Sequence, residues 1–394
     1  MLKADFRMES GTMVIALSGS IDSGNAPSLE EQIREACGTE LPASVLLDCG
    51  HLAYLSSAGL RVILRLKKDV ANTRIINVNA EVYDILEMTG FTELMEVQKA
   101  YRTISIQGCE TVGEGANGKV YRIDPEIIVK VYRKPDALPE IKRERDLART
   151  AFVAGVPTAI PYDVVRIEEG GYGSVFELLD ASSYVTLLMR GEKTLDEIAG
   201  MSIRLLKLIH SKTVKPGTLP DMKETALDWA AFLKDYLPRE EHGRLVRLID
   251  GVSQDLHILH GDYHINNIML QNGESLLIDM DTICCGHPVF ELASMYNAYV
   301  GYGIRNPEKI TRFLGIPAEE TAKLWKKSLE LYLGTEDEAA VRSVEEKAKV
   351  VGLARIMRRE IRRGELKTPE GRDLVEYCRT ALTDLLSRVD TLLF

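Results

Sequence analysis

The pattern of apolar and polar residues over the first hundred positions alternates between the periods of strands and of helices. Helical spacing predicts helices that begin at Asn25 and that span 60–70 and 81–88, whereas short apolar runs predict strands at 3–8, 13–17, 45–48 and 74–78. Two strand–helix–strand units in succession favour a sheet with helices packed on it. We therefore expect an α/β domain with a mixed sheet in residues 1–107.

A different pattern begins near residue 104. A charged helix is expected at 138–154, and strand-like runs surround it at 105–113, 119–123, 126–132, 162–167 and 172–178. From Thr194 onward the chain is mostly helical, and Thr194 with Glu197 forms a capping-box pattern. These patterns predict a second domain at 108–394, with a small β-rich lobe over about 108–180 and a helical lobe over about 181–394.

Composition restricts the class of protein. The chain has 394 residues, of which 45% are hydrophobic and 27% charged, with a formal net charge of -10, which excludes a disordered or collagen-like chain. Charged residues interrupt the first twenty positions, and no later stretch approaches the roughly 18 apolar residues of a membrane span. Both predicted domains carry more acidic than basic residues, which argues against nucleic acid as a partner. We expect a cytosolic protein without a membrane partner.

Cysteine usage points to reduced thiols. The six cysteines show neither CxxC pairs nor the density of a small disulfide-linked domain, and they stand at Cys37, Cys49, Cys109, Cys284, Cys285 and Cys378. We expect no disulfide framework and no zinc site.

A glycine-rich segment lies between two of the strands predicted in the second domain. Gly113, Gly115, Gly118 and Val120 match the pattern GxGxxGxV, in which glycine lets the backbone approach phosphate oxygens. An ordinary hairpin turn is the alternative explanation.

A single lysine, Lys130, ends the apolar run that begins at Ile127. Its ammonium group can neutralise nucleotide phosphates, and Glu144 on the following charged helix can hold it in position. A solvated lysine and an unrelated glutamate are the alternative.

The segment from His260 to Asn267 carries the most specific pattern. Asp262 is followed by Asn267, and a second carboxylate, Asp279, comes at the end of the next apolar strand. Phosphoryl transfer requires these parts: a group that orients the acceptor hydroxyl and two oxygen ligands for Mg²⁺. Asp281 is a less expected further contact to the metal. We expect His260 to organise the loop through hydrogen bonds.

On these residues, the part from about residue 108 resembles the aminoglycoside phosphotransferase and choline kinase superfamily of protein-kinase-like folds. The resemblance implies a bilobal α+β fold with ATP between the lobes. By motif position it implies Asp262 as catalytic base, Asn267 and Asp279 as Mg²⁺ ligands, and nucleotide contacts from the glycine-rich segment, Lys130, Glu144 and a hinge that includes Glu177 and Leu178. Where relatives commonly show GDPxxDLA, this chain has Gly286-His287-Pro288-Val-Phe-Glu291-Leu-Ala293, a departure that concerns support of the loop more than chemistry.

Residues 1–107 are similar to the STAS domain of anti-sigma-factor antagonists. The similarity rests on Ser18-Gly-Ser-Ile21-Asp22, on Leu55-Ser56-Ser57-Ala-Gly59-Leu60 and on a closing Leu86-Glu-Met-Thr-Gly90-Phe91. By position, Ser57 is the family's phosphorylated serine, and Ser56 stands where an aspartate is often found. From its place before a predicted helix, Ser57 is also expected to be the N-cap of that helix. The resemblance leaves open a domain that serves only for protein interaction.

One helix predicted near the C-terminal end carries a stripe of arginines at three- and four-residue spacing: Arg355, Arg358, Arg359, Arg362 and Arg363. A solvated face paired with Glu360 and Glu365 is the first interpretation. The second is a surface that receives a phosphorylated group or the acidic STAS domain.

These observations predict an enzyme that transfers the γ-phosphate of ATP, with Mg²⁺, to a hydroxyl group. The expected acceptor is a small metabolite, with amine-bearing compounds among the candidates, and the STAS domain is a regulatory or docking module. The alternative is a protein serine kinase that acts on Ser57, in cis or in trans, as an anti-sigma-type switch. The choice between ATP and GTP stays open.

Overall fold

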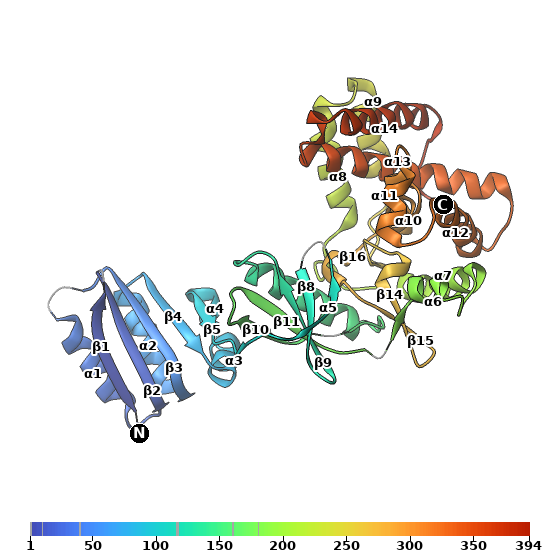
Figure 1. Cartoon of the computed structure of the whole chain (residues 1–394). Coiled ribbons are helices and arrows are strands. Elements are labelled where there is room, and N and C mark those ends of the chain that lie inside the picture. The colour runs from blue at the N-terminus through green and yellow to red at the C-terminus, as the bar shows by residue number, and fades with distance from the viewer. Residues whose placement is uncertain (1, 10, 39–40, 116–117, 160, 180) are drawn as a thin grey trace. The chain divides into compact units, whose positions relative to one another are not determined.

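The computed structural model describes residues 2–9, 11–38, 41–115, 118–159, 161–179 and 181–394 (Figure 1). Two compact units make up the chain: the first comprises 1–107 with 164–170, and the second comprises 108–163 with 171–394. Each is described by itself.

The first unit is a five-stranded mixed sheet in the order β1-β2-β3-β4-β5, in which β1 is antiparallel to β2 and the remaining pairs are parallel. Its strands are β1 (Lys3–Glu9), β2 (Thr12–Ile21), β3 (Ser44–Leu55), β4 (Thr73–Val78) and β5 (Val97–Lys99). Its helices are α1 (Ala26–Cys37), α2 (Ser57–Asp69), α3 (Ala80–Met88) and α4 (Phe91–Leu94). The predicted α/β class of this part is confirmed.

Helices α1 and α2 lie side by side on one face of this sheet (Figure 1), and Arg65 of α2 forms an ion pair with Glu30 of α1. The apolar stripe of each helix packs on the strands, so that Leu29 and Ile63 share a core with Ile15, Leu47 and Ile75. Burial of these side chains holds the unit together, at about 1.5–3 kcal/mol for each fully buried aliphatic side chain.

The second unit begins with antiparallel strands in the order β11-β9-β8-β7. They are β7 (Glu110–Glu114), β8 (Gly118–Asp124), β9 (Ile127–Tyr132) and β11 (Tyr172–Glu177), and the helix α5 (Leu138–Val153) follows β9. The strand predicted at 105–113 is wrong in its first half, because Gly108 adopts a left-handed conformation at φ 78 and the Ser105 hydroxyl donates to Glu169. Instead, β6 (Thr103–Ile104) pairs in parallel with residues 166 and 167 of β10 (Pro161–Ile167).

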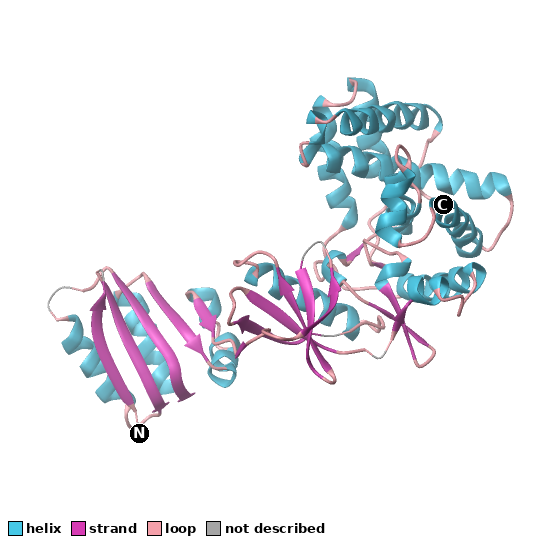
Figure 2. Cartoon of the chain, viewed as in Figure 1, coloured by secondary structure: helices cyan, strands magenta, loops and turns pink. Residues whose placement is uncertain are grey.

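The rest of the second unit is mostly helical, as Figure 2 shows by colour. Its α-helices are α6 (Tyr184–Met189), α7 (Leu195–His210), α8 (Met222–Phe232), α9 (Arg239–Asp250), α10 (Pro288–Tyr299), α11 (Pro307–Leu314), α12 (Ala318–Leu333), α13 (Glu338–Arg362) and α14 (Pro369–Arg388). The predicted capping box of Thr194 and Glu197 begins α7. Helix α10 is buried from Val289 to Tyr299 and forms the centre of this core. Together these parts form the kinase-like α+β fold that the sequence predicted.

Short strands between α9 and α10 position two loops. The strand β13 (Ile258–Leu259) pairs with β16 (Cys284–Cys285), and β14 (Ile268–Gln271) pairs with β15 (Glu274–Leu277). The chain from β13 to β14 and the chain from β15 to β16 therefore run next to each other. The first carries Asp262 and Asn267, and the second carries Asp279.

The cysteines at all six positions are free, and those at 49, 284, 285 and 378 are buried. Within the described parts of the chain, no helix combines the length and the apolar character needed to cross a membrane.

Candidate active site

Lys130 joins three elements of the second unit. Its side chain extends from β9, and its Nζ lies 2.8 Å from Oε1 of Glu144 on α5 and 2.9 Å from Oδ1 of Asp279. Burial alone would lower the pKa of Lys130, but the carboxylates of Asp279 and Glu144 outweigh it and raise that pKa above its usual range. The lysine is therefore a fixed positive charge. The predicted pairing of Lys130 with Glu144 is confirmed.

Glu144 is held from both sides. Its side chain is only 8% exposed, and the hydroxyl of Tyr132 donates to its second carboxylate oxygen. Burial raises the pKa of Tyr132 above its usual range; the charge of Lys130 opposes this, and the charge of Glu144 adds to it, so the phenol stays neutral and remains a donor. Each oxygen of this buried carboxylate has a partner, as a buried charge requires.

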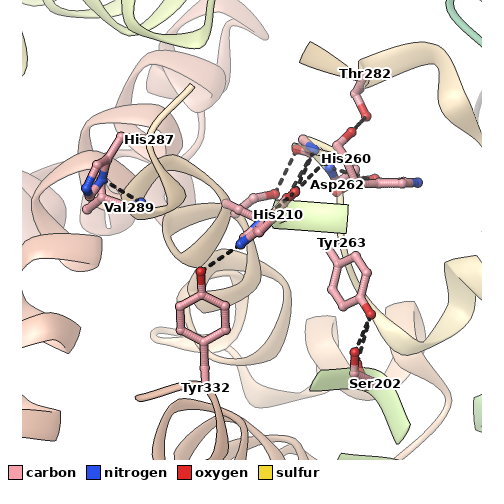
Figure 3. A network of polar contacts seen from close by, with 12 residues as sticks. Ser202, His210, His260, Asp262, Tyr263, Thr282, His287, Val289 and Tyr332 are labelled. Atoms are coloured by element: carbon pink, nitrogen blue, oxygen red, sulfur yellow. Dashed lines mark hydrogen bonds and ion pairs between the residues drawn. The ribbon is translucent and has the colours of Figure 1, made fainter. Parts of the chain in front are cut away.

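Asp262 lies in a loop that His260 organises. His260 Nδ1 accepts from the backbone N–H of Asp262 at 3.3 Å, and its Nε2 donates to the carbonyl of Ile278 at 3.1 Å, which links the two loops. The hydroxyl of Thr282 donates to the carbonyl of His260, as Figure 3 shows. The structural role predicted for His260 is confirmed.

Tyr263 anchors the same loop in the core. Its ring is fully buried, and its hydroxyl donates to the carbonyl of Ser202 on α7 at 2.6 Å (Figure 3). Tyr263 thus fixes the loop in place. The side chain of the neighbouring Asp262 is 39% exposed, so a substrate can reach it.

Opposing influences act on the carboxyl group of Asp262. Burial by itself would raise its pKa, but the hydrogen bond and charge of His264, together with the charge of Arg355, lower that pKa to about 2. His264 is buried, its Nε2 lies 3.5 Å from Oδ2 of Asp262, and its Nδ1 has no hydrogen-bond partner among the described residues. Asp262 is thus ionised at neutral pH.

Asn267 and Asp279 present oxygen atoms from the two adjacent loops. The Nδ2 of Asn267 donates to the carbonyl of Asp262 at 3.0 Å, which orients the amide and leaves Oδ1 as its remaining acceptor. Asp279 is 40% exposed and adopts a left-handed conformation with φ 63 and ψ 64. Such a backbone costs about 1–3 kcal/mol in a residue other than glycine and is typical of functional sites.

These two residues have the chemistry that Mg²⁺ prefers, because it binds through one or two side-chain oxygens and takes its other ligands from phosphates and water. No cluster of three or more His, Cys, Asp or Glu side chains that could hold a metal occurs in the described ranges, so a cage built from such residues alone is not formed there. Asp281 lies close by, and burial, followed by the charges of Asp279 and Glu144, raises its pKa to about 7.

The backbone before Asp262 is supported by α10 and α13. Glu291 of α10 is fully buried and accepts from the N–H groups of His260 and Gly261. The carbonyl of Gly261 accepts from Oγ of Ser294 at 2.9 Å and from Nη1 of Arg355 at 3.2 Å. The expectation that the segment around Glu291 supports the loop is confirmed. Sequence reasoning missed Ser294 and this role of Arg355, since no motif marks a contact to a backbone carbonyl.

The glycine-rich segment forms the hairpin of β7 and β8, in which Gly113 pairs with Val120 and the N–H of Gly115 donates to the carbonyl of Gly118. A side chain at Gly118 would lie 2.1 Å from the carbonyl oxygen of Val131 on β9, so close strand packing requires this glycine. Ala116 and Asn117 lie outside the described residues. A contact of this hairpin with phosphate stays a prediction.

The predicted hinge lies at the end of β11. The carboxylate of Glu177 accepts from the hydroxyl of Tyr162 at 3.3 Å, and the N–H of Leu178 donates to the carbonyl of Glu126 at 2.7 Å. The backbone N–H of Leu178 is therefore already used within the protein. Binding of the adenine at this hinge stays a prediction.

Ser57 lies in the first unit, as the first residue of α2. The expectation that it caps this helix is wrong, because the side chain of Ser56 accepts from the N–H of Gly59 and is the N-cap. Ser57 is exposed, and its hydroxyl forms no hydrogen bond with the described residues.

Two families of known proteins match separate parts of the chain. A model of the STAS domain matches residues 3–105, and a model described as the phosphotransferase enzyme family matches residues 108–310. The putative anti-sigma factor antagonist BtrV of Bordetella bronchiseptica is 32% identical over 91 residues, which are 22% of this chain and 78% of that protein.

Solved structures also resemble the chain at low identity. The ADP-bound aminoglycoside phosphotransferase APH(2'')-Ib is 17% identical, with a TM-score of 0.49 over 78% of this chain and 99% of that one. A choline/ethanolamine kinase family protein from Mesorhizobium loti is 16% identical, with a TM-score of 0.46 over 71% of this chain and 92% of that one. The matched family model spans more than half of the sequence: the chain belongs to the phosphotransferase enzyme family and carries a STAS domain in residues 3–105.

Proposed function

We propose that the chain transfers the γ-phosphate of ATP, with Mg²⁺, to a hydroxyl group of a small metabolite in the cytoplasm. The observation that carries this proposal is the double contact of Lys130 with Glu144 and Asp279, next to the loop of Asp262 and Asn267. A fixed cation, two oxygen ligands and an ionised carboxylate are the parts that phosphoryl transfer uses for positioning and charge neutralisation.

Each residue has a separate task in this proposal. Lys130 neutralises the α- and β-phosphates while Glu144 keeps its ammonium in place. Asn267 and Asp279 hold Mg²⁺, which neutralises charge on the transferred phosphoryl group when it is bound. Gly113, Gly115, Gly118 and Val120 cover the phosphates, and Glu177 with Leu178 lies beside the base.

Asp262 acts on the acceptor. Because its carboxylate is ionised at neutral pH, it accepts a hydrogen bond from the acceptor hydroxyl and takes the proton as the new bond between that oxygen and the γ-phosphorus forms. The bond from this phosphorus to the oxygen of ADP breaks in the same transfer, so ADP and a phosphate ester are the products.

The test incubates the full chain with ATP, Mg²⁺ and a set of hydroxyl compounds, and measures both ADP release and the new phosphate ester by mass spectrometry. Asp262→Asn should lower product formation by at least a thousandfold while ATP still binds. Asp196→Asn, which changes an exposed carboxylate on α7, is the matched control and should keep full activity. Equal product formation by Asp262→Asn and wild type would exclude this function.

A second function is supported by Ser57. Its exposed hydroxyl is free for modification, and a phosphate at the first turn of α2 would gain from the helix N-terminus while adding about two negative charges to the surface. In this function the kinase acts on a STAS-domain serine, in cis or in trans, and the STAS domain docks a protein partner. Phosphate mapped to Ser57 after incubation with ATP, and lost in Ser57→Ala, would support it; a chain that stays unmodified while a metabolite is phosphorylated would exclude it.

A further inference from the structure

Three arginines of α13 form a positively charged face that begins at the candidate active site. Arg355, Arg358 and Arg362 recur at intervals of three and four residues, so they lie on one side of the helix. The first of them reaches the loop of Asp262, since its Nη1 lies 3.2 Å from the carbonyl of Gly261 and 3.0 Å from Oγ of Ser294. The face thus starts one residue from the carboxylate that we assign to the acceptor.

Aromatic rings of α8 hold two of these guanidinium groups. The Arg355 group lies over the ring of Trp229 at 5.3 Å, and the Arg358 group lies over the ring of Phe232 at 5.7 Å. Tyr236 stacks on Phe232 in turn, with 5.7 Å between the ring centroids. Stacking on aromatic faces fixes the orientation of a guanidinium group, so less side-chain entropy is lost when the group binds a ligand.

The same arginines form no ion pair with the described residues. In the described ranges of the chain, no carboxylate oxygen lies within the 4.0 Å of an ion pair from Arg355, Arg358 or Arg362, whereas the neighbouring Arg359 pairs with Glu360 at 3.3 Å. The expected pairing is therefore found only between Arg359 and Glu360 among the described residues, whereas Arg362 is exposed, as expected of a solvated face.

Arg358 is the least satisfied of the three. Its Nε is buried and has no hydrogen-bond partner in the part of the chain that the structure describes. Burial, followed by the like charge of Arg362, lowers its pKa; Asp228 acts in the opposite direction, and Arg355 adds to the lowering. Neighbouring like charges repel one another, and an anion bound among them relieves that repulsion. Although the chain has a net charge of -10, no carboxylate of the described residues forms an ion pair with Arg355, Arg358 or Arg362.

We propose that the face from Arg355 to Arg362 binds the anionic part of the acceptor, so that the substrate is a small hydroxyl compound with a carboxylate or phosphate group. This inference rests on the proposed function, and it replaces the amine-bearing acceptor that was among the expectations. The planar guanidinium group matches both kinds of anion through paired hydrogen bonds, whereas an amine would be repelled by the same three charges.

The spacing also limits the size of the acceptor. Seven residues separate Arg355 from Arg362, which is about 10 Å along a helix at 1.5 Å per residue. A molecule with its hydroxyl at Asp262 and its anionic group at Arg358 or Arg362 therefore has the size of a metabolite with several carbon atoms.

The experiment compares glycerol 3-phosphate, D-glycerate, glycerol and choline, which carry hydroxyl groups but differ in charge. Binding is measured through the fluorescence of Trp229 in a Trp325→Phe background, with ADP and Mg²⁺ present; the chain has 2 tryptophans, so this reporter is then unique. We expect the two anions to bind more tightly than glycerol or choline. The ratio of the affinities for glycerol 3-phosphate and D-glycerate distinguishes a site for phosphate from a site for carboxylate.

Arg358→Gln should weaken binding of the preferred anion at least tenfold, because it removes charged hydrogen bonds. Arg358→Lys should restore part of the affinity. The matched control is Arg342→Gln, an exposed arginine on the same helix that should leave affinity unchanged. Thermal unfolding of each variant confirms that the fold is retained.

Three outcomes would overturn the inference. Choline or glycerol could bind more tightly than both anions, or all four compounds could bind with equal affinity. Arg358→Gln could also bind the preferred anion as tightly as wild type. Transfer of phosphate to a neutral or cationic compound would support the proposed function but contradict the inferred anionic acceptor. Anion binding through Arg358 without any phosphate ester formed from ATP would remove the proposed function and leave only an anion site. Transfer to Ser57 alone would identify a protein acceptor and overturn the small-molecule class.

Discussion

The ammonium of Lys130 lies 2.9 Å from Oδ1 of Asp279, although 149 residues separate them in sequence. The contact connects β9 with the loop that follows β15, and Glu144 holds the same ammonium from α5. One lysine therefore sets the spacing between the proposed phosphate-binding strand and the proposed metal-binding loop.

Lys130→Met should raise the KM for ATP at least tenfold and lower turnover, because the phosphates lose their fixed positive charge. It also leaves the buried carboxylate of Glu144 without its cation, which should destabilise the fold by about 3 kcal/mol. Initial-rate kinetics and urea unfolding measure the two effects. Lys134→Met, which removes a highly exposed lysine after β9, should change neither quantity. An unchanged KM for ATP in Lys130→Met would contradict the assignment.

Asp279→Asn should abolish turnover while the protein remains folded. Asparagine tolerates the left-handed backbone at this position nearly as well as aspartate, so little stability is lost through the backbone. The amide removes the one negative charge that the two proposed ligands bring to the metal, and we expect a loss of at least a thousandfold in kcat with a melting temperature that shifts by only a few degrees. Circular dichroism and a coupled ADP assay check both statements. Substantial residual activity with Mg²⁺ would show that another group holds the metal.

Glu291→Ala should loosen the loop of Asp262. It leaves the buried N–H groups of His260 and Gly261 without an acceptor, and each unsatisfied group costs about 1–3 kcal/mol. Ser294→Ala should cost less, because the Gly261 carbonyl keeps its bond from Arg355. We expect Glu291→Ala to lower both stability and kcat more than Ser294→Ala does, and we expect the KM for ATP to stay nearly unchanged in both variants. If Ser294→Ala proved the more harmful variant, the loop would depend on a different support.

Much of the site was predictable because its parts are short in sequence or lie on regular elements. The spacing of Asp262, Asn267 and Asp279 follows from the hairpin of β14 and β15 and from the pair of β13 and β16 that encloses it, because the two connecting loops must then lie next to each other. Lys130 was recognisable as the single charge after the apolar run from Ile127, and Glu144 as a helical residue within reach of it.

Other features depend on contacts that no local pattern encodes. Gly118 is required by the carbonyl of Val131 on the paired strand, which a motif cannot distinguish from a need for phosphate. Arg355 contacts Gly261 across 94 residues, so a stripe of arginines in the sequence resembled a solvated face. Ser56 and Ser57 are both good N-cap residues, and only the first turn of α2 decides between them.

The stability of the protein at acid pH should depend on the ionisation of Asp262. Its pKa of about 2 in the folded chain lies below the value of about 3.9 expected after unfolding. A group with a lowered pKa in the folded state contributes stability that is fully present above its unfolded pKa and that is lost as pH falls through its folded pKa. The stability difference between wild type and Asp262→Asn should therefore be constant from pH 6 to about pH 4 and should then shift against wild type toward pH 2.

Urea unfolding of both proteins across this range measures the difference. His264→Gln removes the first of the groups that lower this pKa, so in that background the total shift should be smaller and should be complete at a higher pH than in wild type. Because the carboxylate stays ionised above pH 5, protonation of Asp262 in the free enzyme should produce no acid limb in kcat/KM between pH 5 and pH 8. A stability difference that stays constant down to pH 2 would mean that Asp262 has an ordinary pKa. A difference that shifts in favour of wild type as pH falls would mean that its pKa is raised, and the hydroxyl-orienting role would then require a different protonation state.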